Sequence, residues 1–87
     1  MLENTAVISN GVGLHARPAA RLVETAMRFK SDVILLHGGA TINAKSAFSV
    51  LSGNVRGGSE VVVRVEGSDE EEAMAAVMAC LRNLLNE

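Results

Sequence analysis

Residues 60–71 read Glu-Val-Val-Val-Arg-Val-Glu-Gly-Ser-Asp-Glu-Glu, and this stretch joins a strand to the start of the last helix. In the segment Glu60–Glu66, Val61, Val63 and Val65 alternate with Arg64 and Glu66, which predicts a strand with one apolar face. Ser68 and Glu71 have the spacing of a capping box, and the acidic cluster around them suits a helix N-terminus. The helix that follows carries a continuous apolar stripe of Ala73, Ala76, Val77, Cys80, Leu81 and Leu84.

The rest of the chain contains patterns for three more strands and two more helices. The predicted strands are Glu3–Ser9, Val33–His37 and Ala40–Asn43, and the predicted helices are Ala16–Phe29 and a short helix that Ser46 caps and that contains Phe48 and Leu51. The apolar face of the first helix comprises Ala19, Leu22, Val23, Ala26 and Met27. Gly38-Gly39 suits a tight hairpin, so the strands on either side of it are expected to be antiparallel. The order β-α-β-β-α-β-α predicts an α+β two-layer sandwich and leaves the strand order open.

The composition indicates one small globular domain spanning residues 1–87. Hydrophobic residues make up 48% of the chain and charged residues 21%, which is typical of a globular protein rather than a disordered one. A net charge of −2, two Phe and no Trp or Tyr argue against a nucleic-acid-binding surface. The apolar runs are too short for a membrane span, and the first residues do not resemble a signal peptide. Cys80 is the one cysteine, so no internal disulfide can form and the protein is expected to be cytoplasmic. Its place in the apolar stripe of the last helix indicates a core residue.

The segment Gly13-Leu14-His15-Ala16-Arg17-Pro18-Ala19-Ala20 places a histidine where a loop turns into a helix. Pro18 is pre-organised for a first helical turn, so His15 falls at or next to the N-cap. Backbone N–H groups and the positive end of the helix dipole make such a position an anion site. Imidazole is a competent nucleophile near neutral pH, and Arg17 with the N–H groups of Ala16 and Arg17 can bind a phosphoryl group. An isolated histidine there is usually a surface or cap residue, whereas the whole octapeptide favours a phosphoryl carrier.

The octapeptide, together with Asn43-Ala44-Lys45-Ser46, resembles HPr, the histidine-containing phosphocarrier family of the bacterial phosphoenolpyruvate:sugar phosphotransferase system. The resemblance implies a four-stranded antiparallel sheet with three helices on one face. It also implies that His15 is phosphorylated on Nδ1 and that Arg17 supports the phosphoryl group. A serine before a helix commonly does no more than cap it, but the resemblance implies regulatory phosphorylation of Ser46 as well. The implied docking face comprises Ala16, Ala20, Met27, Ala47, Phe48 and Leu51.

The resemblance implies a phosphoryl carrier and not an enzyme with its own turnover. Its donor would be Enzyme I, and its acceptors would be IIA domains of sugar permeases. A serine kinase/phosphorylase and a catabolite-control transcription regulator would be further partners. A monomer is expected, with no cofactor, no nucleic-acid partner and no membrane insertion. His15, His37 and Cys80 lack the spacing of metal ligands, so no metal site is expected.

A second hypothesis is an HPr-like regulatory paralogue. Such a protein acts in carbon catabolite repression through the serine, or keeps the histidine and serves a nitrogen-related or dihydroxyacetone-kinase-linked system. The presence of His15 argues against a paralogue that lacks the histidine, but it leaves the alternative carriers open. The chain also departs from the usual family residues at Val12, Ala47 and Gly53-Asn54.

Overall fold

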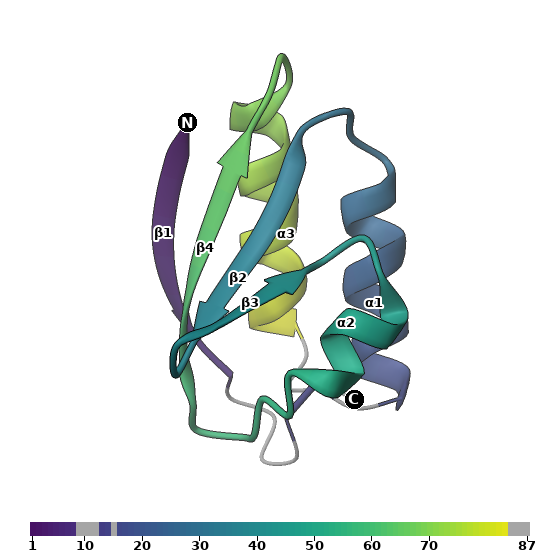
Figure 1. The fold of residues 1–87 in the computed structure, drawn as a ribbon. Helices are drawn as coiled ribbons and strands as arrows, with labels where there is room; N and C mark the ends of the chain where they lie inside the picture. Colours follow the sequence, from purple (N-terminus) through teal and green to yellow (C-terminus); the bar gives the residue numbers. More distant parts are fainter. Residues whose placement is uncertain (9–12, 15, 84–87) are drawn as a thin grey trace.

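A computed structural model describes residues 1–8, 13–14 and 16–83 of the chain. The elements are β1 (Leu2–Val7), α1 (Ala16–Met27), β2 (Asp32–His37), β3 (Ala40–Asn43), α2 (Ala47–Ser52), β4 (Glu60–Glu66) and α3 (Glu70–Asn83). The strands form one sheet in the order β1-β4-β2-β3, and every neighbouring pair is antiparallel. Figure 1 shows α1 and α3 side by side along the sheet, and α2 follows β3 and packs against α1. The predicted element order and the two-layer α+β sandwich with helices on one face of the sheet are confirmed.

The core lies between the sheet and the helices because β4 buries every second residue. Val61, Val63 and Val65 are fully buried, as the alternation predicts. Val65 is paired with Leu2 of β1 on one side and with Val33 of β2 on the other. The helices cover this face with buried side chains spaced along one stripe each: Ala19, Leu22 and Ala26 of α1, and Ala73, Val77 and Leu81 of α3. Cys80 is half-buried and packs against the same core.

Three elements have bounds that differ from the prediction, and one of them is β2, which begins at Asp32 rather than Val33. The first strand is β1 at Leu2–Val7 rather than Glu3–Ser9, and Ser9 lies outside the described residues. The first helix ends at Met27 rather than Phe29. The N–H groups of the next two residues donate to carbonyls only three positions back, at 3.2 and 3.3 Å, so the α-helix closes in a tight final turn.

Two large apolar residues of the first helix and the first strand are exposed to solvent. Met27 was predicted on the apolar face of α1, but its side chain is 61% exposed because it stands at the solvent edge of the stripe, one turn after half-buried Val23. Val7 interrupts the alternation of β1 and is 55% exposed, since it lies opposite Glu60 on the solvent face of the sheet.

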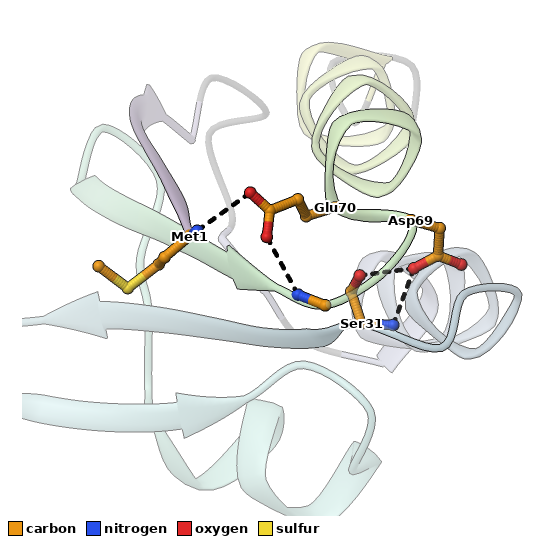
Figure 2. Close-up of polar contacts among 5 residues, drawn as sticks. Met1, Ser31, Asp69 and Glu70 are labelled. Carbon is orange, nitrogen blue, oxygen red and sulfur yellow. Dashed lines mark hydrogen bonds and ion pairs between the residues drawn. The ribbon is translucent and has the colours of Figure 1, made fainter.

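The predicted capping box between Ser68 and Glu71 is wrong. Since α3 begins at Glu70, it is the Glu70 carboxylate that reaches back and accepts the N–H of Gly67 at 3.2 Å. The same carboxylate pairs with the ammonium group of Met1 at 3.0 Å, which ties the start of β1 to the start of α3 (Figure 2). Both contacts lower the pKa of Glu70, the hydrogen bond from Gly67 more than the ammonium group.

A second carboxylate at this end of the molecule joins α3 to the α1–β2 turn. Asp69 accepts the backbone N–H of Lys30 at 2.9 Å. It also accepts the backbone N–H of Ser31 at 2.9 Å and the hydroxyl of Ser31 (Figure 2). Ser31 is 1% exposed and is the one buried polar residue in the described part of the chain. The hydrogen bond from its hydroxyl, followed by the N–H of Lys30, lowers the pKa of Asp69 from 3.8 to about 2. Asp69 therefore supplies the acceptor that a buried hydroxyl requires.

Replacing Asp69 by Asn is expected to lower the Tm at pH 7 and to flatten its decline in acid. The lowered pKa means that the folded protein binds the proton less readily than the unfolded chain. The stabilisation is therefore present above about pH 4 and lost as the pH falls from 3.8 towards about 2. Circular dichroism melts of wild type and Asp69→Asn from pH 7 to pH 2 measure the effect, with Asp32→Asn as the control at an exposed aspartate. Equal Tm values for wild type and Asp69→Asn at pH 7 would contradict the assignment.

Candidate functional site

The residues that lead into α1 are held on the connection between α2 and β4. The N–H of Leu14 donates to the carbonyl of Val55 at 2.8 Å, and both side chains are 3% exposed. Gly13 has a φ of +83°, and a Cβ there would overlap the Val55 carbonyl and lie 2.6 Å from Cα of Arg56. Glycine is therefore required at Gly13 both by the left-handed backbone and by the close approach of the second chain segment.

The same connection between α2 and β4 is also hydrogen-bonded to Ile8, the residue that follows β1. The N–H of Ile8 donates to the carbonyl of Ser59 at 2.9 Å, and the N–H of Gly58 donates to the carbonyl of Ile8 at 2.6 Å. Residues on both sides of segment 9–12 are thus bonded to one stretch, 55–59. Backbone hydrogen bonds of this kind leave no repeating pattern in the sequence, so the contacts of residues 55–59 were not predicted. Gly13 is the one residue whose type indicates a close approach of another segment.

The predicted phosphoryl-binding groups lie at the start of α1. His15 lies outside the described residues, and α1 begins at Ala16 directly after it. Arg17 is exposed in the first turn, whereas Pro18 is buried and has no N–H to offer. Ala16 and Arg17 therefore occupy the first two helical positions, whose N–H groups point out of a helix towards an anion.

Ser46 caps α2, as the sequence predicts. It has an extended backbone, with φ −119° and ψ 115°, and its Oγ accepts the N–H of Ser49 at 3.2 Å. The Ser49 hydroxyl in turn accepts the N–H of Asn43 at 2.9 Å, so the short helix is tied to β3. Lys45 donates from Nζ to the carbonyl of Phe29 at 2.8 Å, which joins this cap to the end of α1.

The residues of the expected docking face are all exposed, on α1 and on α2. This set comprises Ala16, Ala20, Met27, Ala47, Phe48 and Leu51. The exposed fractions are 61% for Met27, 80% for Phe48 and 48% for Leu51. Exposed Arg17 and Arg21 lie on the same helix as Met27. The two helices therefore present apolar side chains among arginines, as protein–protein interfaces often do.

The described residues contain no group of three or more His, Cys, Asp and Glu side chains that could hold a metal ion. His37 lies at the end of β2, where its Nδ1 is 3.5 Å from the carbonyl of Glu60. In the same part of the chain, no helix is both long enough and apolar enough to cross a membrane.

Comparison with known proteins gives consistent relatives over the whole chain. Residues 2–83 match a family model described as the PTS HPr component phosphorylation site. The chain is 39% identical over 87 residues to the phosphocarrier protein HPr of Xylella fastidiosa strain 9a5c, covering 100% of this chain and 98% of the relative. It is 43% identical over 82 residues to that of Mycoplasma genitalium, covering 93% of each. The crystal structure of HPr-C-His from Thermoanaerobacter tengcongensis, 40% identical, superposes with a TM-score of 0.94 and covers 100% of this chain and 98% of its own.

A methyl group at position 13 is expected to destabilise the protein more than one at position 39. Gly13 and Gly39 share nearly the same φ, +83° and +85°, but only at Gly13 would the Cβ meet other atoms within 4 Å. Gly39→Ala carries the cost of the left-handed backbone alone, about 1–2 kcal/mol. Gly13→Ala adds the overlap with Val55 and is expected to lose about 3 kcal/mol or more. Urea unfolding of both variants measures the difference, and equal losses would show that the close approach to Val55 is unimportant.

Proposed function

This chain belongs to the HPr family of phosphocarrier proteins of the phosphotransferase system, and we propose that it accepts a phosphoryl group on His15 from Enzyme I and passes it to IIA domains. The observation that carries the proposal is the position of His15, directly before the first residue of α1 and directly after a segment bonded to Val55. We further propose that residues 1–87 act as one domain and as a monomer, because the face beside the site must stay open to two successive partners.

The proposed chemistry is a transfer between nucleophiles. The Nδ1 lone pair of His15 forms a bond to phosphorus as the bond from phosphorus to the donor breaks. In the second step the acceptor forms a bond to phosphorus as the bond from Nδ1 to phosphorus breaks. The phosphoryl group carries nearly two negative charges, which must be balanced on the carrier. Arg17 supplies directed charged donors, and the N–H groups of Ala16 and Arg17 supply the helix N-terminus. The carrier thereby holds the group, while its partners supply the remaining catalytic groups.

The exposed faces of α1 and α2 support a docking surface for both partners. Met27, Phe48 and Leu51 are large apolar side chains left in solvent, and exposed residues of this kind mark interaction sites. They lie on the two helices that flank the proposed site, so one partner surface can cover them and still reach His15. Phosphorylation of Ser46, at the start of α2, would place a double negative charge beside Phe48 and would oppose apolar or acidic partners.

Incubation with phosphoenolpyruvate, Mg²⁺ and Enzyme I is expected to add one acid-labile phosphate to the wild type. Intact-mass spectrometry measures it. His15→Ala should remain unphosphorylated, whereas His37→Ala should gain the phosphate, because His37 lies at the end of β2 and not at a helix start. With an Enzyme I that is active on a control carrier, an unmodified wild type would refute the proposed function. Phosphate on His15→Ala would refute the assigned residue.

Incubation with ATP and an HPr serine kinase is expected to add one acid-stable phosphate at Ser46. Ser46→Ala should lose this phosphate, and Ser49→Ala should keep it, since the Ser49 hydroxyl is bonded to the backbone of Asn43. The serine phosphate should also lower the rate of phosphoryl transfer from Enzyme I by placing charge on the docking face. A mass gain that persists in Ser46→Ala would contradict the regulatory role of this serine.

A further inference from the structure

We propose that Arg56 is a second guanidinium that binds the phosphoryl group on His15, approaching it from the α2–β4 connection rather than from α1. The inference rests on the proposed function, because it concerns the phosphorylated form of the same site. Arg56 is not among the docking residues or the phosphoryl-binding residues expected from the sequence. It is assigned here from its position in the fold.

The backbone of Arg56 lies against Gly13, two residues before His15. Its Cα is 2.6 Å from the place that a Cβ on Gly13 would occupy, so these two backbones touch. Its neighbour Val55 accepts the N–H of Leu14 at 2.8 Å. Leu14 is bonded covalently to His15, and consecutive Cα atoms are only about 3.8 Å apart. In Figure 1 the α2–β4 connection runs along the end of the molecule at which α1 begins. The segment of Arg56 is thus brought to Gly13 and Leu14, the two residues before His15, by tertiary contact across more than forty residues of chain.

The backbone of Arg56 is held, while its side chain extends into solvent. Its carbonyl accepts the N–H of Ser59 at 3.1 Å, and Val55 beside it is buried. Arg56 is exposed, and in the described part of the chain no carboxylate pairs with its guanidinium. Other cations of the chain are engaged elsewhere: Lys45 on the carbonyl of Phe29, and Arg64 on Glu3 at 2.6 Å. Arg56 therefore has a fixed backbone and a guanidinium that no carboxylate holds. This arrangement suits a side chain that binds a phosphoryl group only while His15 is phosphorylated.

Two guanidinium groups fit the charge of the phosphoryl group better than one. The group carries nearly two negative charges and three acceptor oxygens. A single arginine therefore neutralises only part of the charge and leaves some of the oxygens bonded to water. Arg17 comes from the first turn of α1, and Arg56 comes from the separate segment that is hydrogen-bonded to Leu14 through Val55. Contacts from two directions would favour the phosphorylated form over the free histidine. Arg56 should therefore raise the phosphorylated fraction at equilibrium and slow the loss of phosphate to water.

Arg56→Gln, Arg56→Lys and the control Arg28→Gln test the assignment. Arg28 is an exposed arginine that follows the last residue of α1, at the helix end remote from His15, so its substitution removes the same charge away from the site. The first readout is the phosphorylated fraction at a fixed ratio of pyruvate to phosphoenolpyruvate with Enzyme I. The second is the hydrolysis half-life of the purified phosphoprotein, which involves no partner. Thermal melts confirm that each variant is folded.

Arg56→Gln is expected to lower the equilibrium constant for phosphorylation and the half-life by roughly two- to five-fold, the size of an exposed ion pair. Arg56→Lys should recover part of the loss, and the difference from wild type should shrink at high salt. Unchanged values in Arg56→Gln, or equal losses in Arg28→Gln, would overturn the inference while leaving the proposed function intact. A slower transfer from Enzyme I with unchanged equilibrium and half-life would also overturn it, because Arg56 would then act on the partner. A wild type without acid-labile phosphate would overturn the proposed function and the inference together.

Discussion

The burial of β4 between β1 and β2 is the constraint on which the rest of the structure depends. Its three inward valines are covered by helices and flanked on both sides by other strands, so the strand cannot shift by one residue without exposing them. The segments attached to its two ends are placed by the same constraint. The connection that enters β4 carries residues 55–59 to the candidate site, and the turn that leaves it carries Gly67 and Asp69 to the opposite end.

The two ends of β4 are used differently. At the exit, Asp69 satisfies the buried hydroxyl of Ser31, and Glu70 holds the N-terminus of the chain. These contacts join α1, β1 and α3 and serve stability. At the entry, backbone hydrogen bonds from 55–59 support the residues that precede α1, and the Arg56 side chain there is exposed. A phosphoryl carrier benefits from this separation, because charge is gained and lost at one end while the carboxylates that tie the elements together lie at the other.

The candidate site combines a local and a distant contribution. A helix that starts directly after a histidine supplies N–H groups and Arg17 from adjacent sequence, which is why the octapeptide alone predicted an anion site. Val55 and Arg56 arrive from another element through backbone contact with Gly13 and Leu14. The exposed apolar residues of α2 lie beside α1 because α2 packs against that helix, with Lys45 bonded to the carbonyl of Phe29 after α1 and Ser49 bonded to Asn43 of β3.

The sequence by itself determined the elements and their inward faces, because a strand or helix repeats its side-chain direction every two or 3.6 residues and each pattern is complete within a short window. It also predicted the cap at Ser46, while the family resemblance supplied the packing of the helices on one face and the expected site and docking residues. Only the tertiary structure decided that Glu70 and not Glu71 closes the start of α3, that Asp69 serves Ser31, and that Gly13 touches Arg56. The contacts of Asp69 with Ser31 and of Gly13 with Arg56 join residues far apart in the chain, and such pairings depend on how the elements pack rather than on any local repeat. The role of Glu70 follows from the residue at which α3 begins.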